Sequence, residues 1–159
     1  MRSEESLLAQ LPIAPRPQGA YVPAIAHQIP GEEGGLVMTA GMTPRIDGTL
    51  QYRGQVGREL DLATAQAAAS IAVGNALAAA VASLGPDRRF DRVLRLIVYV
   101  NAGPDFEQHT AVADGASSRL RELLGQDGDA ARAAVGVTSL PGGACVEVEL
   151  TCAWLAGNR

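Results

Sequence analysis

An arginine and a glutamate near the carboxyl end have the types and spacing for acid–base chemistry on a small acid. Arg132 opens an extended apolar segment, which turns at residues 141–143 and returns as a strand that carries Glu147. A guanidinium binds a carboxylate through two parallel hydrogen bonds, and a glutamate ionised beside it can act as a base or orient water. The hypothesis requires both groups, on neighbouring strands, to face one cavity where separate polypeptides meet. It fails if they lie on opposite sides of the sheet.

Each candidate residue also has a plainer interpretation. Arg132 fits a solvated charge at a strand end, and Glu147 shares its strand face with Glu149, as on a solvated edge strand. Tyr21 is either a pocket residue or an ordinary half-buried strand tyrosine. His109 is more typical of an exposed helix residue than of a catalyst.

Composition narrows the classes of function. The chain has 159 residues, of which 47% are hydrophobic, and a formal net charge of −4 without any lysine. This length and apolar content indicate one domain with its own core. The acidic balance argues against a nucleic-acid partner, because phosphate binding needs a basic face. The absence of lysine excludes Schiff-base lysine chemistry.

Neither a metal nor a cofactor is expected. His27 and His109 lack zinc-ligand spacing, and Cys145 and Cys152 are typical of small buried side chains in a reducing cytosol. The glycine pairs at 34–35 and 142–143 indicate turns rather than phosphate cradles.

The amino-terminal region and the longest apolar run do not indicate targeting or membrane insertion. The first ten residues lack the apolar core of a signal peptide, and the run at 67–84 is interrupted by polar residues and is too short to span a bilayer. We therefore expect a cytoplasmic protein without a membrane partner.

The pattern predicts a six-stranded mixed sheet with two helices on one face. The expected strands are 20–27, 36–41, 49–52, 93–100, 131–137 and 146–154, and the expected helices are 3–11, 61–84 and 106–124. Ser3 is the expected cap of the first helix. Asp47-Gly48 predicts a two-residue hairpin, and Asp114-Gly115 is expected to divide the last helix, with Asp114 as a cap.

The strand at 93–100 is apolar on both faces, which indicates burial on both sides. Two helices cover only one face of such a sheet. We therefore expect other copies of the chain, arranged with cyclic symmetry, to cover the second face.

Several of these segments together resemble the RidA/YjgF family of reactive-intermediate deaminases. The resemblance covers about residues 20–154 and rests on Tyr21-Val22, on Thr39-Ala-Gly41-Met-Thr-Pro44, and on Arg132 through Leu140-Pro141 to Val146-Glu-Val-Glu149. The runs at 54–57 and Asp114-Gly-Ala-Ser117 look like a longer branch of that family. By this resemblance residues 20–159 form a RidA-like domain, preceded by an N-terminal helix and a proline-rich extension at 1–19.

The resemblance implies a chorismate-mutase-like α+β fold assembled as a homotrimeric barrel, with sites in the clefts between subunits. It implies hydrolysis of enamines and imines, such as 2-aminoacrylate, to 2-keto acids and ammonia, without a cofactor. Arg132 would grip the substrate carboxylate and Glu147 would position water or move a proton. Tyr21 and Gly41 would line the pocket around a small imino or keto acid.

Three positions depart from the family pattern. Ala40, Pro104 and Ala134 stand where many members have a serine, an asparagine and a cysteine, which hints at a bulkier or more apolar acid. Two alternatives stay open: a non-catalytic member that binds a small carboxylate as a sensor or scavenger, and an endoribonuclease. The acidic charge and the few aromatic residues disfavour the second alternative.

Overall fold

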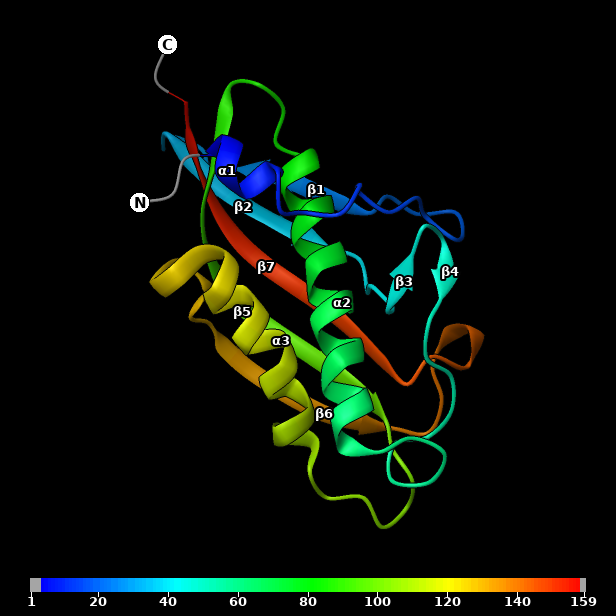
Figure 1. The fold of residues 1–159 in the computed structure, drawn as a ribbon. Coiled ribbons are helices and arrows are strands. Elements are labelled where there is room, and N and C mark those ends of the chain that lie inside the picture. The colour runs from blue at the N-terminus through cyan, green and yellow to red at the C-terminus, as the bar shows by residue number, and fades with distance from the viewer. Residues whose placement is uncertain (1–3, 158–159) are drawn as a thin grey trace.

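A computed structural model describes residues 4–157 as a five-stranded sheet with two long helices on one face (Figure 1). The strand order is β1-β2-β7-β5-β6. Strands β5 and β6 pair in parallel, joined by helix α3 (His109–Leu124), and the other neighbours pair antiparallel. The bounds of these strands are β1 Ala24–Gln28, β2 Gly34–Thr39, β5 Arg88–Asn101, β6 Ala131–Val137 and β7 Val146–Ala156.

The predicted six-stranded sheet is wrong because the third predicted strand leaves the main sheet. Strands β3 (Arg45–Ile46) and β4 (Thr49–Leu50) form a separate hairpin. Asp47 and Gly48 both have positive φ, at 49° and 80°, as the predicted two-residue turn requires. The Asn75 amide of helix α2 donates to the carbonyl oxygens of Thr43 (3.2 Å) and Arg45 (2.9 Å), which holds this segment against the helix.

Helix α2 (Leu62–Ala82) confirms the first long predicted helix. The Asp61 carboxylate caps it by accepting from the Thr64 N–H at 2.8 Å, which lowers the pKa of Asp61. By length and composition this helix could cross a bilayer, contrary to our expectation for residues 67–84. However, 72% of its apolar window is buried inside the domain, as in the core helix of a globular protein.

Helix α3 (His109–Leu124) begins later than predicted and is not divided at Gly115. A Cβ built on Gly115 would overlap the carbonyl oxygen of Gln66 in α2, so this glycine allows the two helices to approach closely. The Gln66 amide also donates to the Ala111 carbonyl oxygen at 2.8 Å. Asp114 therefore lies in a continuous helix and is not a cap.

The N-terminal helix α1 covers Glu4–Leu8, which is shorter than predicted. Its predicted cap, Ser3, lies outside the described residues. The following proline-rich segment crosses the outer side of α2 (Figure 1), and Pro12 lies beside Gly74 of that helix.

The two faces of the sheet have different environments. Towards the helices, Leu96, Val98 and Val148 are buried. On the other face, Met38 is 47% exposed and its cross-strand partner Ile25 is 57% exposed. Within one chain, the predicted burial of both faces of the central strand is therefore not reached, and a face with exposed apolar side chains is left uncovered.

Candidate functional site

Glu147 and Gly41, two of the predicted site residues, lie against each other. A pair of backbone hydrogen bonds joins Met42 to Val148, at 2.7 and 2.9 Å, and so places Gly41 beside Glu147. A Cβ built on Gly41 would overlap the Glu147 Oε1 atom. Gly41 is therefore needed as glycine because any side chain there would displace the carboxyl group.

The environment of Glu147 makes its carboxyl group harder to ionise than an exposed glutamate. Burial raises the pKa of Glu147, and the negative charge of Glu149 on the same strand face raises it further. The Tyr99 hydroxyl donates to Glu149 Oε1 at 3.1 Å, and burial together with the Glu149 charge raises the pKa of Tyr99. The expectation that a nearby arginine keeps Glu147 ionised is not met within one chain.

Arg132 is a tethered cation rather than a solvated one. Its Nη1 atom donates to Asp114 Oδ1 at 2.8 Å and to Ser117 Oγ at 2.9 Å, and its Nη2 atom donates to the Thr110 carbonyl oxygen at 3.4 Å. The Arg132 side chain is only 21% exposed. Its three partners follow one face of α3 at spacings i, i+4 and i+7.

The predicted pairing of Arg132 with Glu147 on neighbouring strands is wrong. Strand β5 lies between β6 and β7, because the α3 crossover returns the chain to the far edge of the sheet. Arg132 pairs with Leu96, which is buried under the helices, whereas Glu147 pairs with Tyr99 on the uncovered face. The two groups therefore project from opposite faces, and one chain cannot hold one small acid between them. The sequence-based hypothesis of one cavity shared by both groups on neighbouring strands thus fails within one chain.

Tyr21 lies in the loop before β1 and not within a strand. It is 46% exposed, and its hydroxyl accepts a hydrogen bond from the Gln18 N–H at 3.1 Å. Two residues further on, the Pro23 carbonyl oxygen accepts from the Ala40 N–H at 2.8 Å. The loop that carries Tyr21 is thereby tied to the segment that leads into Gly41.

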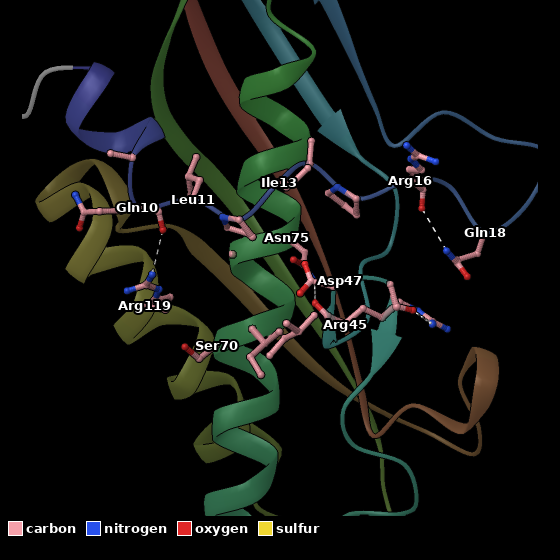
Figure 2. Close-up of a pocket in the computed structure, with 18 residues that line it drawn as sticks. Gln10, Leu11, Ile13, Arg16, Gln18, Arg45, Asp47, Ser70, Asn75 and Arg119 are labelled. Carbon is pink, nitrogen blue, oxygen red and sulfur yellow. Dashed lines mark hydrogen bonds between the residues drawn. The ribbon is translucent and has the colours of Figure 1, made fainter.

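A cavity of about 910 Å³ lies away from these groups, on the outer side of α2 (Figure 2). The proline-rich segment, the β3–β4 hairpin and α2 form its walls, and Arg119 of α3 contributes at one end. The guanidinium of Arg119 is engaged by Glu122 at 2.7 Å, and that of Arg45 by the Gly48 carbonyl oxygen at 2.8 Å. None of the four predicted site residues lines this cavity.

The cysteines and the metal-ligating side chains do not add a second reactive centre. Cys145 and Cys152 are free and buried, as predicted, and burial raises their thiol pKa values to about 11 and about 12. Their thiolates are therefore scarce near neutral pH. Across residues 4–157, His, Cys, Asp and Glu side chains do not gather in any group of three or more suited to a metal ion.

The anchor of Arg132 is the feature that sequence reasoning missed. We assigned Asp114 to a helix cap, whereas it forms an ion pair with Arg132. The spacing of Thr110, Asp114 and Ser117 along one helix face was the available signal, since such a polar stripe needs a partner when the helix packs on a sheet.

Comparisons with known proteins agree with this architecture. Residues 17–151 match the family described as "YjgF/chorismate mutase-like, putative endoribonuclease". Protein TCP17 of Trypanosoma cruzi is 36% identical over 141 residues, which cover 88% of this chain and 84% of that protein.

Two crystal structures are similar over nearly the whole chain. The protein Atu1372 from Agrobacterium tumefaciens, of unknown function, is 36% identical with a TM-score of 0.78, over 94% of this chain and 90% of that one. A putative endoribonuclease from Shewanella oneidensis is 28% identical with a TM-score of 0.80, over 94% and 97%. The family match spans most of the sequence and the fold agrees with it, so this chain belongs to the YjgF/chorismate mutase-like family.

Proposed function

We propose that this protein is a cytosolic homotrimeric deaminase that hydrolyses small 2-imino acids to 2-keto acids and ammonia, at sites composed of two copies of the chain. The observation that carries the proposal is the anchoring of the Arg132 guanidinium together with the buried surroundings of the Glu147 carboxyl group. The guanidinium is held on the edge strand by acceptors of α3, and burial beside Gly41 raises the pKa of the Glu147 carboxyl group. Imine hydrolysis requires one group that holds the substrate carboxylate and one group that transfers protons.

The proposal requires two copies because these groups lie on opposite faces of one sheet. Met38 and Ile25 leave apolar surface uncovered on the face that carries Glu147, and such surface is typical of a contact with another copy. A neighbouring copy that packs at the edge of the sheet can then supply its own Arg132 to this Glu147.

The chemistry needs one cation and one proton carrier. Arg132 binds the substrate carboxylate through charge-assisted hydrogen bonds, each contributing about 1.5–3 kcal/mol. Protonated Glu147 gives its proton to the enamine carbon, and the resulting iminium is attacked by water at the C=N carbon. The carboxylate of Glu147 takes a proton from that water and passes it to the amine nitrogen. Ammonia then leaves as the hydroxyl proton returns to Glu147 and the keto group forms, so Glu147 ends protonated as it began.

Subunit mixing tests this proposal. An amino-acid oxidase supplies imines, and release of the keto acid is followed with and without the protein. We expect acceleration by the unmodified protein and none by Arg132→Ala or by Glu147→Gln. If each site takes one group from each of two neighbours, randomly mixed subunits of the two variants regain about a quarter of the activity.

Two outcomes count against the proposal. A mixture that stays as inactive as its components, under conditions where subunits exchange, removes the two-copy site. Failure of the unmodified protein to accelerate keto-acid release from any 2-imino acid removes the deaminase itself.

The second candidate is a non-catalytic carboxylate-binding protein, as a sensor or scavenger. It is favoured by the alanine and proline at the three departing positions, which remove polar groups from the inferred pocket. The structure of TdcF from Escherichia coli, which is described with bound serine, shares the fold at 19% identity. A thermal shift with 2-ketobutyrate, without turnover of any imine, supports this candidate.

An endoribonuclease is the third candidate, because the family description and the Shewanella oneidensis relative carry that term. The net charge of −4 disfavours it, since RNA binding draws on positive charge. Cleavage of a labelled RNA that is lost in Glu147→Gln would support it over the deaminase.

A further inference from the structure

We infer that Thr110, Asp114 and Ser117 of α3 position the Arg132 guanidinium and make its site selective for ligands with a single negative charge. This inference rests on the proposed carboxylate-binding role of Arg132 and extends it to the class of acid that binds. It draws on the run Asp114-Gly-Ala-Ser117, for which the proposed reaction has no other use.

The hydrogen bonds that Arg132 makes within residues 4–157 leave one edge of its guanidinium without an acceptor. A guanidinium has five N–H groups. Nη1 uses both of its hydrogens on Asp114 and Ser117, and Nη2 uses one on the Thr110 carbonyl oxygen. In the contacts made within residues 4–157, the Nε–H and the second Nη2–H remain, and these two bind a carboxylate side-on through parallel hydrogen bonds.

Helix α3 fixes the orientation of that edge. Gly115 holds α3 close against α2, because its missing side chain leaves room for the Gln66 carbonyl. At the start of the helix, the His109 ring lies over Gly136 of β6, where a Cβ would overlap its Nε2 atom. The guanidinium is therefore anchored to a helix that is itself fixed on both sides. Because the Arg132 side chain is already ordered, ligand binding costs little of its conformational entropy.

The Asp114 carboxylate sets the charge that a ligand meets. It lies 2.8 Å from Nη1 and offsets much of the charge of Arg132. One ligand carboxylate still gains the two remaining N–H hydrogen bonds of the guanidinium. A second negative charge on the ligand has no such partner and is repelled by Asp114. Because the Asp114 side chain is 58% exposed, water weakens this repulsion. The geometry therefore favours monocarboxylates such as 2-ketobutyrate over dicarboxylates such as 2-ketoglutarate.

Calorimetric binding of these two keto acids to the intact protein tests the inference. Asp114→Asn keeps an oxygen acceptor but removes the charge, so we expect the preference for 2-ketobutyrate over 2-ketoglutarate to fall by about fivefold. Ser117→Ala should weaken both acids equally, and Ser117→Thr should restore them. Glu122→Gln is the matched control on the same helix, since Glu122 pairs with Arg119 instead.

The outcomes separate this inference from the proposed function. Binding of 2-ketobutyrate without turnover of any imine removes the deaminase and leaves the inference in place. The inference is overturned if Arg132→Ala binds 2-ketobutyrate as well as the unmodified protein does. It is also overturned if Asp114→Asn lowers the melting temperature without changing the ratio of the two affinities, because Asp114 is then only a structural partner.

Discussion

The surroundings of Glu147 and of Arg132 have opposite electrostatic effects on the charges of these side chains. Glu147 lies on the uncovered face beside a second acid, and burial and like charge raise its pKa. Arg132 lies on the helix side, where its own chain supplies a counter-ion and two further acceptors. Among residues 4–157 the Glu147 carboxyl group has no ion pair, whereas Arg132 has three acceptors. The proposed site therefore requires another copy to bring a cation to Glu147.

A substitution at Gly41 tests the Glu147 side of this comparison most directly. Gly41→Ala places a methyl group where the Glu147 carboxyl now lies, so we expect turnover to fall about 100-fold or more while the fold survives. The loss is measured as kcat/KM for keto-acid release, with circular dichroism as the check on folding.

Gly19→Ala is the control for that substitution, because its new methyl group meets only the Tyr21 ring, at 3.5 Å. Unchanged turnover in Gly41→Ala would show that Glu147 can move without consequence and is not part of the site.

A substitution at Gly115 tests the Arg132 side of the comparison. Gly115→Ala forces α3 away from α2 and should lower the free energy of unfolding by about 1–3 kcal/mol, while also loosening the anchor of Arg132. Gly74→Ala, in α2, meets only Pro12 Cδ at 3.9 Å and should instead stabilise the helix by up to about 1 kcal/mol. Urea unfolding of both variants measures the contrast, and equal effects would contradict the close helix contact.

Local rules explain which parts of the fold were predictable. The start of the first long helix at residues 61–62, the Asp47-Gly48 turn and the alternation along β7 are set by a few neighbouring residues, and all three are present as the sequence indicated. The Gly115 prediction failed because the same residue type serves both to end a helix and to admit a neighbouring backbone. Sequence spacing does not distinguish these two uses.

The site was harder to predict because it depends on strand order. Arg132 and Glu147 are close in sequence and lie on consecutive strands, which suggested that the strands are neighbours. The parallel pairing of β6 with β5 places a strand between them, and this pairing is decided by the α3 crossover rather than by the residues of β6 or β7. The family pattern therefore supplies candidate residues, whereas their relative placement needed the three-dimensional fold.

The pH dependence of the melting temperature tests the raised pKa of Glu147. Because the native pKa of Glu147 is raised, the native chain holds more protons than the unfolded chain at pH values between the ordinary pKa of 4.5 and the raised one. Stability from this group is present below the ordinary pKa and is lost as the pH rises through that window. Glu147→Gln should therefore melt at a higher temperature than the unmodified protein near neutral pH, with the difference vanishing below pH 4.5. A difference that is constant with pH would mean that Glu147 titrates normally.

Glu149→Gln should give the smallest effect and separates the two causes of the Glu147 shift. Burial is the larger cause and stays in this variant, whereas the like charge of Glu149 is removed. We therefore expect the pKa of Glu147 to fall only part of the way towards its ordinary value, as followed by carbon-13 NMR of the side-chain carboxyl group. The pKa of Tyr99 should fall with it, because the Glu149 charge also raises that pKa. A shift at Tyr99 without one at Glu147 would mean that the two carboxyl groups do not interact, and the proton on Glu147 would then depend on burial alone.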